Sequence, residues 1–172
     1  IGVTGSAGKS TTASLIYAAL KESSVPSLLG GNLGGSILQS LNQIDENTIV
    51  VFELSSAMLW WLGDEHEEGW SPHVGVLTNI FPNHLDWHRT MKSYVSCKEN
   101  MFKFQRAGDV AIRSQEIDLS CDQLSILGKH NQRNASAALA AALAVGAEKR
   151  KSLKGISNFK GLPHRLEKVG DF

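Results

Sequence analysis

Short apolar runs alternate along the chain with stretches in which apolar side chains recur at helical spacing. An apolar segment ends at Thr4, and residues 11–22 then follow a helical pattern. The run 48–54 is apolar on both faces, as expected for a strand inside a parallel sheet. Residues 131–145 form a second long helical pattern, with small side chains that permit close packing on a sheet. This alternation predicts an α/β fold, in which helices flank a mostly parallel sheet in three layers.

The other predicted elements are shorter. The pattern indicates further strands at 26–30, 73–79 and 109–112, and further helices at 36–41 and 91–104. The polar stretch 113–125 receives no assignment. The tail from Gly161 has little core of its own, so we expect one domain over 1–160 and the start of another at 161–172.

Composition excludes several classes of protein. The chain has 172 residues and a formal net charge of zero, so no overall field attracts nucleic acid or acidic lipid. The longest apolar stretch, 135–147, is too short to span a bilayer, and no signal peptide is visible. Cys97 and Cys121 predict reduced thiols in a cytoplasmic protein. Because the chain lacks an initial Met and opens inside a predicted strand, we expect it to be a piece of a longer polypeptide.

The segment from Thr4 to Thr12 carries the most specific chemistry. Its glycines allow a tight turn that directs backbone N–H groups at phosphate oxygens, and the helix that follows adds its positive end. Lys9 can reach the outer phosphates, and Ser10 can offer a hydroxyl to Mg²⁺. The alternative is a glycine-rich turn with a surface lysine. The pattern favours a sheet of the P-loop NTPase kind, with nucleotide binding by Gly5, Ser6, Ala7, Gly8, Lys9, Ser10 and Thr11.

Further polar residues stand where predicted strands end, and ligands bind at such ends in open parallel sheets. Glu53 closes the strand 48–54 and can bind Mg²⁺, or it can be an ordinary loop or capping carboxylate. His84, Asp86 and His88 alternate after another strand, although their spacing matches no common zinc site. A lone histidine is more often structural than a ligand, and we favour that interpretation for His88.

Two asparagines begin the last long helix. Asn131 or Asn134 can cap this helix, or a side-chain amide there can meet a purine edge. The Asn-Lys-x-Asp signature of a guanine site is absent from the sequence, which makes a generic GTPase less favoured.

Taken in order, seven segments resemble the ATP-binding central domain of the Mur ligase family. Each is weak alone, but seven in the family's order are highly specific. The sequences of two of these segments, Gly31–Gly34 and Glu53–Ser56, favour the D-glutamate-adding branch. Ala57 and Met58, however, replace the usual Phe-Gln pair of that branch. The family's first domain and nearly all of its third are absent from the sequence. The seven segments are Thr4–Thr12, Gly31–Gly34, Glu53–Ser56, Asn83–His88, Tyr94 with Lys98, Gly128–Asn131 and Gly161–Arg165.

The resemblance implies an ATP-dependent amide-bond ligase of peptidoglycan precursor synthesis. It would add D-glutamate to UDP-N-acetylmuramoyl-L-alanine through an acyl phosphate, with ATP and Mg²⁺, as a cytoplasmic monomer without nucleic-acid or membrane partners. Two alternatives remain. One is another Mur-type or folylpolyglutamate-synthase-like ligase, and the other is an ATP-binding module that is inactive when isolated.

The resemblance also implies roles for individual residues. Lys9 would neutralise the β- and γ-phosphates, and Ser10 and Glu53 would hold Mg²⁺ between them. His84 would help to hold a second Mg²⁺, and Lys98 would be carbamylated by CO₂ and fix the magnesium site, although by itself it can be read as a solvated helix lysine. Asn131 would contact the nucleotide, and the substrate would contact Asn32, Ser55 and Arg165.

Overall fold

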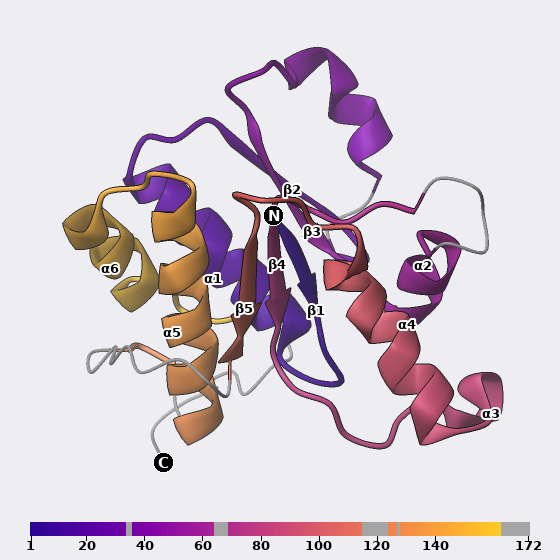
Figure 1. The fold of residues 1–172 in the computed structure, drawn as a ribbon. Helices are drawn as coiled ribbons and strands as arrows, with labels where there is room; N and C mark the ends of the chain where they lie inside the picture. The colour runs from indigo at the N-terminus through magenta and orange to yellow at the C-terminus, as the bar shows by residue number, and fades with distance from the viewer. Residues whose placement is uncertain (34–35, 64–68, 115–123, 127, 163–172) are drawn as a thin grey trace.

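The computed structural model of the protein describes residues 1–33, 36–63, 69–114, 124–126 and 128–162. Five strands form one fully parallel sheet in the order β2-β3-β1-β4-β5 (Figure 1). The strands are β1 (Gly2–Thr4), β2 (Ser27–Gly31), β3 (Ile49–Glu53), β4 (Val74–Leu77) and β5 (Val110–Arg113). In the register of the sheet, Val3 of β1 pairs with Glu53 on one side and with Val76 on the other. The carboxyl ends of these three strands therefore lie at one edge.

Helices cover both faces of the sheet, as the α/β prediction requires. One face carries α1 (Lys9–Glu22), α5 (Lys129–Ala144) and α6 (Lys149–Ser157), and the other carries α2 (Ser56–Trp61) and α4 (Met91–Lys103), with the short α3 (Leu85–His88) next to α4 (Figure 1). Alanines of α5 are fully buried, which lets this helix lie close to α1. The main core joins these alanines to the apolar side chains of α1 and the strands.

The predicted strands and long helices are confirmed, with ends that differ by a few residues. The segment predicted as a helix at 36–41 is a 3₁₀ helix, η1 (Ile37–Gln43). Three helices, α2, α3 and α6, were not predicted. The first two are only six and four residues long, and the nine residues of α6 include only two apolar side chains, Leu153 and Ile156, too few to establish a helical spacing.

The remaining predictions concern the two cysteines, membrane-spanning segments and the domain boundary. Cys97 is a buried free cysteine, whereas Cys121 lies outside the described residues. In the described ranges, no helix has both the length and the apolar character needed to cross a membrane. Most of the unassigned stretch 113–125 and of the tail 161–172 also lies outside these ranges, so the predicted domain boundary stays a prediction.

Candidate functional site

The glycine-rich loop connects β1 to α1 and takes a conformation that requires its glycines. Gly5 has φ of +149° and Gly8 has φ of +79°, a range that side chains rarely adopt. A Cβ on Gly5 would overlap Thr78 Oγ1, and one on Gly8 would lie 2.7 Å from Asn134 Oδ1. The loop therefore touches the ends of β4 and α5 without space for a methyl group.

Residues that follow β4 hold the loop in place. The side chain of Asn79 accepts a hydrogen bond from the Ala7 backbone N–H at 2.9 Å and donates one to the Ala7 carbonyl at 3.0 Å. Thr78 also donates to the Ala7 carbonyl, at 2.6 Å. Neither Thr78 nor Asn79 is among the predicted site residues. Their position just after an apolar strand was the available signal, because the carboxyl ends of parallel strands gather at one edge.

Two lysines converge on this loop. Lys9 donates from Nζ to the carbonyls of Gly5 and Ser6 at 3.1 and 3.3 Å, and Lys98 donates to the same Gly5 carbonyl at 3.0 Å. Lys98 is only 1% exposed, so its interpretation as a solvated helix lysine is wrong. Burial, together with the nearby charge of Lys9, lowers the pKa of Lys98 from 10.5 to about 8. Two cations beside one carbonyl favour the arrival of an anion.

Glu53 ends β3 as a buried carboxylate, with only 2% of its surface exposed. Its Oε1 accepts a hydrogen bond from Asn32 Nδ2 at 3.2 Å, while Oε2 has no partner in the part of the chain that the structure describes. Burying such an oxygen is costly unless a donor or cation compensates. The interpretation of Glu53 as a loop or capping residue is wrong, since it lies in the sheet and Ser55 caps α2.

The donor set around Glu53 fits Mg²⁺ better than zinc. No three His, Cys, Asp or Glu side chains cluster as a metal site within the described ranges. Mg²⁺ commonly takes one or two carboxylates and completes its shell with phosphate oxygens and water. Ser10 is 3% exposed at the start of α1 and can supply the hydroxyl. Oε2, for which the described ranges offer no partner, is therefore the observation that fits a divalent cation here.

The two histidines of the Asn83–His88 segment differ. His84 is exposed and precedes α3 with a left-handed backbone, so its assignment to a second Mg²⁺ stays a prediction. His88 is buried, and its Nε2 lies 2.8 Å from Ser56 Oγ. Burial, reinforced by the charge of Lys98, lowers the pKa of His88 and so favours its neutral imidazole. These observations agree with a structural role for His88.

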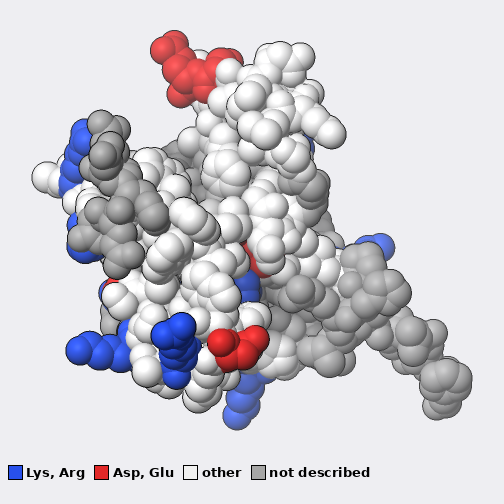
Figure 2. Space-filling view, turned by 90° about the vertical axis from the view of Figure 1, so that its right-hand side faces the viewer, with Lys and Arg blue, Asp and Glu red and all other residues white. Residues whose placement is uncertain are grey.

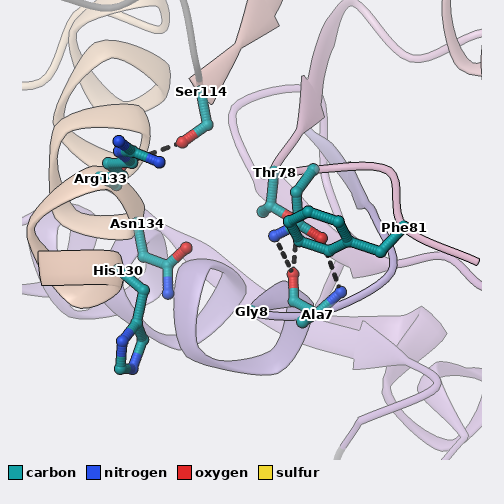
Figure 3. A pocket seen from close by; sticks show the side chains of 9 residues that line it. Ala7, Gly8, Thr78, Phe81, Ser114, His130, Arg133 and Asn134 are labelled. Carbon is teal, nitrogen blue, oxygen red and sulfur yellow. Dashed lines mark hydrogen bonds between the residues drawn. The ribbon is translucent and has the colours of Figure 1, made fainter. Parts of the chain in front are cut away.

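A cavity of about 180 Å³ lies between the glycine-rich loop and the first turns of α5 (Figure 3). Asn134 points into it and donates from Nδ2 to Asn131 Oδ1 at 3.2 Å. Neither asparagine caps the helix, which follows Gly128 without a side-chain cap, so that interpretation is wrong. Asn131 is not among the residues that line the cavity, and its contact with a nucleotide stays a prediction. The cavity is lined by Ala7, Gly8, Thr78, Asn79, Phe81, Ser114, His130, Arg133 and Asn134.

The residues assigned to the second substrate are only partly placed. Asn32 follows β2 and bonds Glu53, while Ser55 accepts the Met58 backbone N–H at 3.1 Å. Arg165 lies outside the described residues. On the side of the molecule that carries α2 and α4, acidic and basic atoms are visible within a hollow of the surface (Figure 2). The glycine-rich loop with Lys9 and Lys98 can bind a polyanion, and Glu53 can bind a cation, at the carboxyl edge of the sheet.

Comparisons with known proteins, by sequence and by structure, agree on one family. The model of the Mur ligase middle domain matches residues 3–121. A UDP-N-acetylmuramoylalanine–D-glutamate ligase from Symbiobacterium thermophilum is 32% identical over 98% of this chain, which covers 46% of that protein. In structure, MurF from Acinetobacter baumannii matches with a TM-score of 0.75 and 23% identity, over 99% of this chain and 48% of MurF. The MurF ligase from Thermotoga maritima, solved with ADP, matches with a TM-score of 0.67 and 17% identity, over 96% and 49%. The chain thus spans about half the length of these relatives.

Proposed function

The chain belongs to the Mur ligase family, and on this premise we propose that it is the ATP-binding middle domain of an ATP-dependent amide-bond ligase. The reaction joins D-glutamate to UDP-N-acetylmuramoyl-L-alanine during peptidoglycan precursor synthesis in the cytoplasm, and the enzyme acts as a monomer. The names and identities of the relatives support this choice of substrates. The observation that carries the proposal is the placement of Lys9 and Lys98 on the Gly5 carbonyl, at the same sheet edge as the Glu53 oxygen that has no partner among the described residues.

The mechanism requires a carboxylate to attack the γ-phosphate of ATP, which gives an acyl phosphate and ADP. The amine of D-glutamate then attacks the acyl carbon, and phosphate leaves. The Lys9 ammonium leaves the carbonyls of Gly5 and Ser6 and donates to phosphate oxygens instead. The backbone N–H groups of the loop hold the β-phosphate. Ser10 and Glu53 would hold Mg²⁺, which when bound neutralises phosphate charge. The protein therefore acts mainly by alignment and charge compensation.

We expect Lys98 to form a carbamate with CO₂. Its neutral amine attacks the carbon of CO₂, a C–N bond forms, and the amine loses a proton to solvent. Because its pKa is about 8 rather than 10.5, the reactive neutral fraction rises from about a tenth at pH 7 to about half at pH 8. An NMR carbamate signal from ¹³CO₂, measured at constant dissolved CO₂, is therefore expected to grow several-fold over this range.

Two variants make this measurement specific. Lys98→Gln is expected to abolish the signal, while Lys103→Gln, which removes an exposed lysine from the same helix, is expected to retain it. A signal that survives in Lys98→Gln would contradict the assignment.

Asn134 is expected to select adenine. Its Nδ2 is engaged by Asn131, which leaves Oδ1 to accept from the adenine amino group, whereas guanine presents a carbonyl there. Asn134→Ala should weaken ATP binding about tenfold and leave GTP binding nearly unchanged. Calorimetric titration of both nucleotides checks this, with Asn158→Ala on the exposed end of α6 as control. An equal loss for both nucleotides would contradict base selection.

Release of ADP by the full-length protein tests the function as a whole. We expect release only when UDP-N-acetylmuramoyl-L-alanine and D-glutamate are both present. A panel with meso-diaminopimelate, L-alanine and folates distinguishes the related ligases. ADP release with one of these substrates instead would favour another branch of the family, and ATP binding without any turnover would favour a nucleotide-binding module.

A further inference from the structure

Tyr94 on α4 is a buried tyrosine that the proposed mechanism does not use, with 1% of its surface exposed. Its hydroxyl lies 2.9 Å from Oγ of Ser6 in the glycine-rich loop. The same Ser6 Oγ donates to the Phe81 carbonyl at 2.9 Å and accepts the Phe81 backbone N–H at 2.8 Å. A serine hydroxyl has one proton and two acceptor positions, so the Tyr94 O–H is the donor to Ser6.

The ring of Tyr94 also contacts the second lysine of the site. Lys98 Nζ lies 4.7 Å from the ring centroid, a distance typical of a cation–π contact. Tyr94 and Lys98 are four residues apart on α4, which places their side chains on one face of the helix. The ring therefore holds the Lys98 ammonium beside the Gly5 carbonyl.

His88 supports this ring from another side. The two ring centroids lie 5.0 Å apart at 67°, and His88 is in turn bonded to Ser56, the first residue of α2. Contacts thus run from the segment after Glu53, through His88 and Tyr94, to Ser6. His88 and Tyr94 thereby link α2 to the glycine-rich loop, two segments that are distant in sequence.

We propose that Tyr94 is a positioning residue that fixes the phosphate-binding loop through Ser6, and so sets the affinity for the triphosphate. The inference rests on the proposed function, because it assumes that this loop binds ATP. Tyr94 itself points at Ser6 and not at the nucleotide cavity, whose lining does not include it. An array of N–H donors binds phosphate well only when its geometry is fixed in advance.

The variant Tyr94→Phe separates the hydroxyl from the ring. It removes one hydrogen bond and keeps the ring beside Lys98 and His88, so we expect the Kd for ATP in the presence of Mg²⁺ to rise about fivefold. The matched control is Tyr17→Phe at the only other tyrosine, which lies on α1 with Lys21 5.8 Å from its ring centroid. The control should keep the wild-type Kd. Calorimetric titration measures both, and thermal unfolding monitors the fold.

A double-mutant cycle with Ser6→Ala tests whether Tyr94 acts on ATP affinity through Ser6. If Tyr94 acts through Ser6, the variant carrying both changes should bind ATP no more weakly than Ser6→Ala alone. If the losses of ATP affinity from the two substitutions multiply in the double variant, the proposal is overturned. A Tyr94→Phe variant with lowered thermal stability and an unchanged Kd for ATP would also overturn it. Failure of the wild-type chain to bind ATP would instead refute the proposed function, so the two outcomes are distinguishable.

Discussion

Replacing Lys9 by alanine is expected to slow ADP release by the full-length protein about a thousandfold. The first residue of α1 brings this ammonium to the loop, where it donates to the Gly5 and Ser6 carbonyls. Negative charge accumulates on the transferred phosphate and on the leaving ADP, and a fixed cation there stabilises the transition state more than the ground state. Steady-state kinetics with both substrates saturating give the rate.

A second lysine on the same helix provides the control for Lys9. Lys21 is exposed in the last turn of α1, and Lys21→Ala removes the same charge away from the loop. That variant should release ADP at nearly the wild-type rate. Near-normal ADP release by Lys9→Ala, with the muramoyl substrate present, would remove Lys9 from the catalytic assignment.

Glu53→Gln is expected to change activity and stability in opposite directions. The amide keeps an oxygen that can accept from Asn32, but it carries no charge to attract Mg²⁺, so ADP release should fall about a hundredfold. Without metal, the wild-type carboxylate is buried with Oε2 unpartnered within the described residues, and a neutral amide costs less to bury. Denaturant unfolding in EDTA should therefore show Glu53→Gln to be about 1 kcal/mol more stable than wild type.

Mg²⁺ should abolish that advantage in the presence of an ATP analogue, because only the wild type gains from the cation. Glu46→Gln, at an exposed turn, is the control and should alter neither activity nor stability. A parallel loss of stability and activity in Glu53→Gln would indicate a purely structural carboxylate, and unaltered activity would exclude it as a metal ligand.

The glycine-rich loop could be predicted because its determinants are local. Positive φ at Gly5 and Gly8, and a lysine at the start of a helix, are encoded within a few adjacent residues. The strands could be predicted for a similar reason, since burial on both faces produces continuous apolar runs. The end of β3 then places Glu53 at the correct edge without knowledge of any tertiary contact.

Other parts of the site depend on contacts between distant segments. Which of Asn131 and Asn134 lines the cavity depends on the rotation of α5 relative to the loop, which the sequence does not specify. The contact between Tyr94 and Ser6 joins residues 88 positions apart, and neither residue type suggests it. Lys98 could be assigned only by family resemblance, because its burial depends on how α4 packs on the sheet.

A crystal structure of this chain with Mg²⁺ and a non-hydrolysable ATP analogue tests the central claim most directly. We predict a triphosphate enclosed by the backbone of residues 5–9, Lys9 turned from its loop carbonyls to the phosphates, Mg²⁺ between Ser10 and Glu53, and the base against Asn134. A nucleotide bound elsewhere, with Lys9 still on the Gly5 and Ser6 carbonyls and no cation near Glu53, would contradict the account.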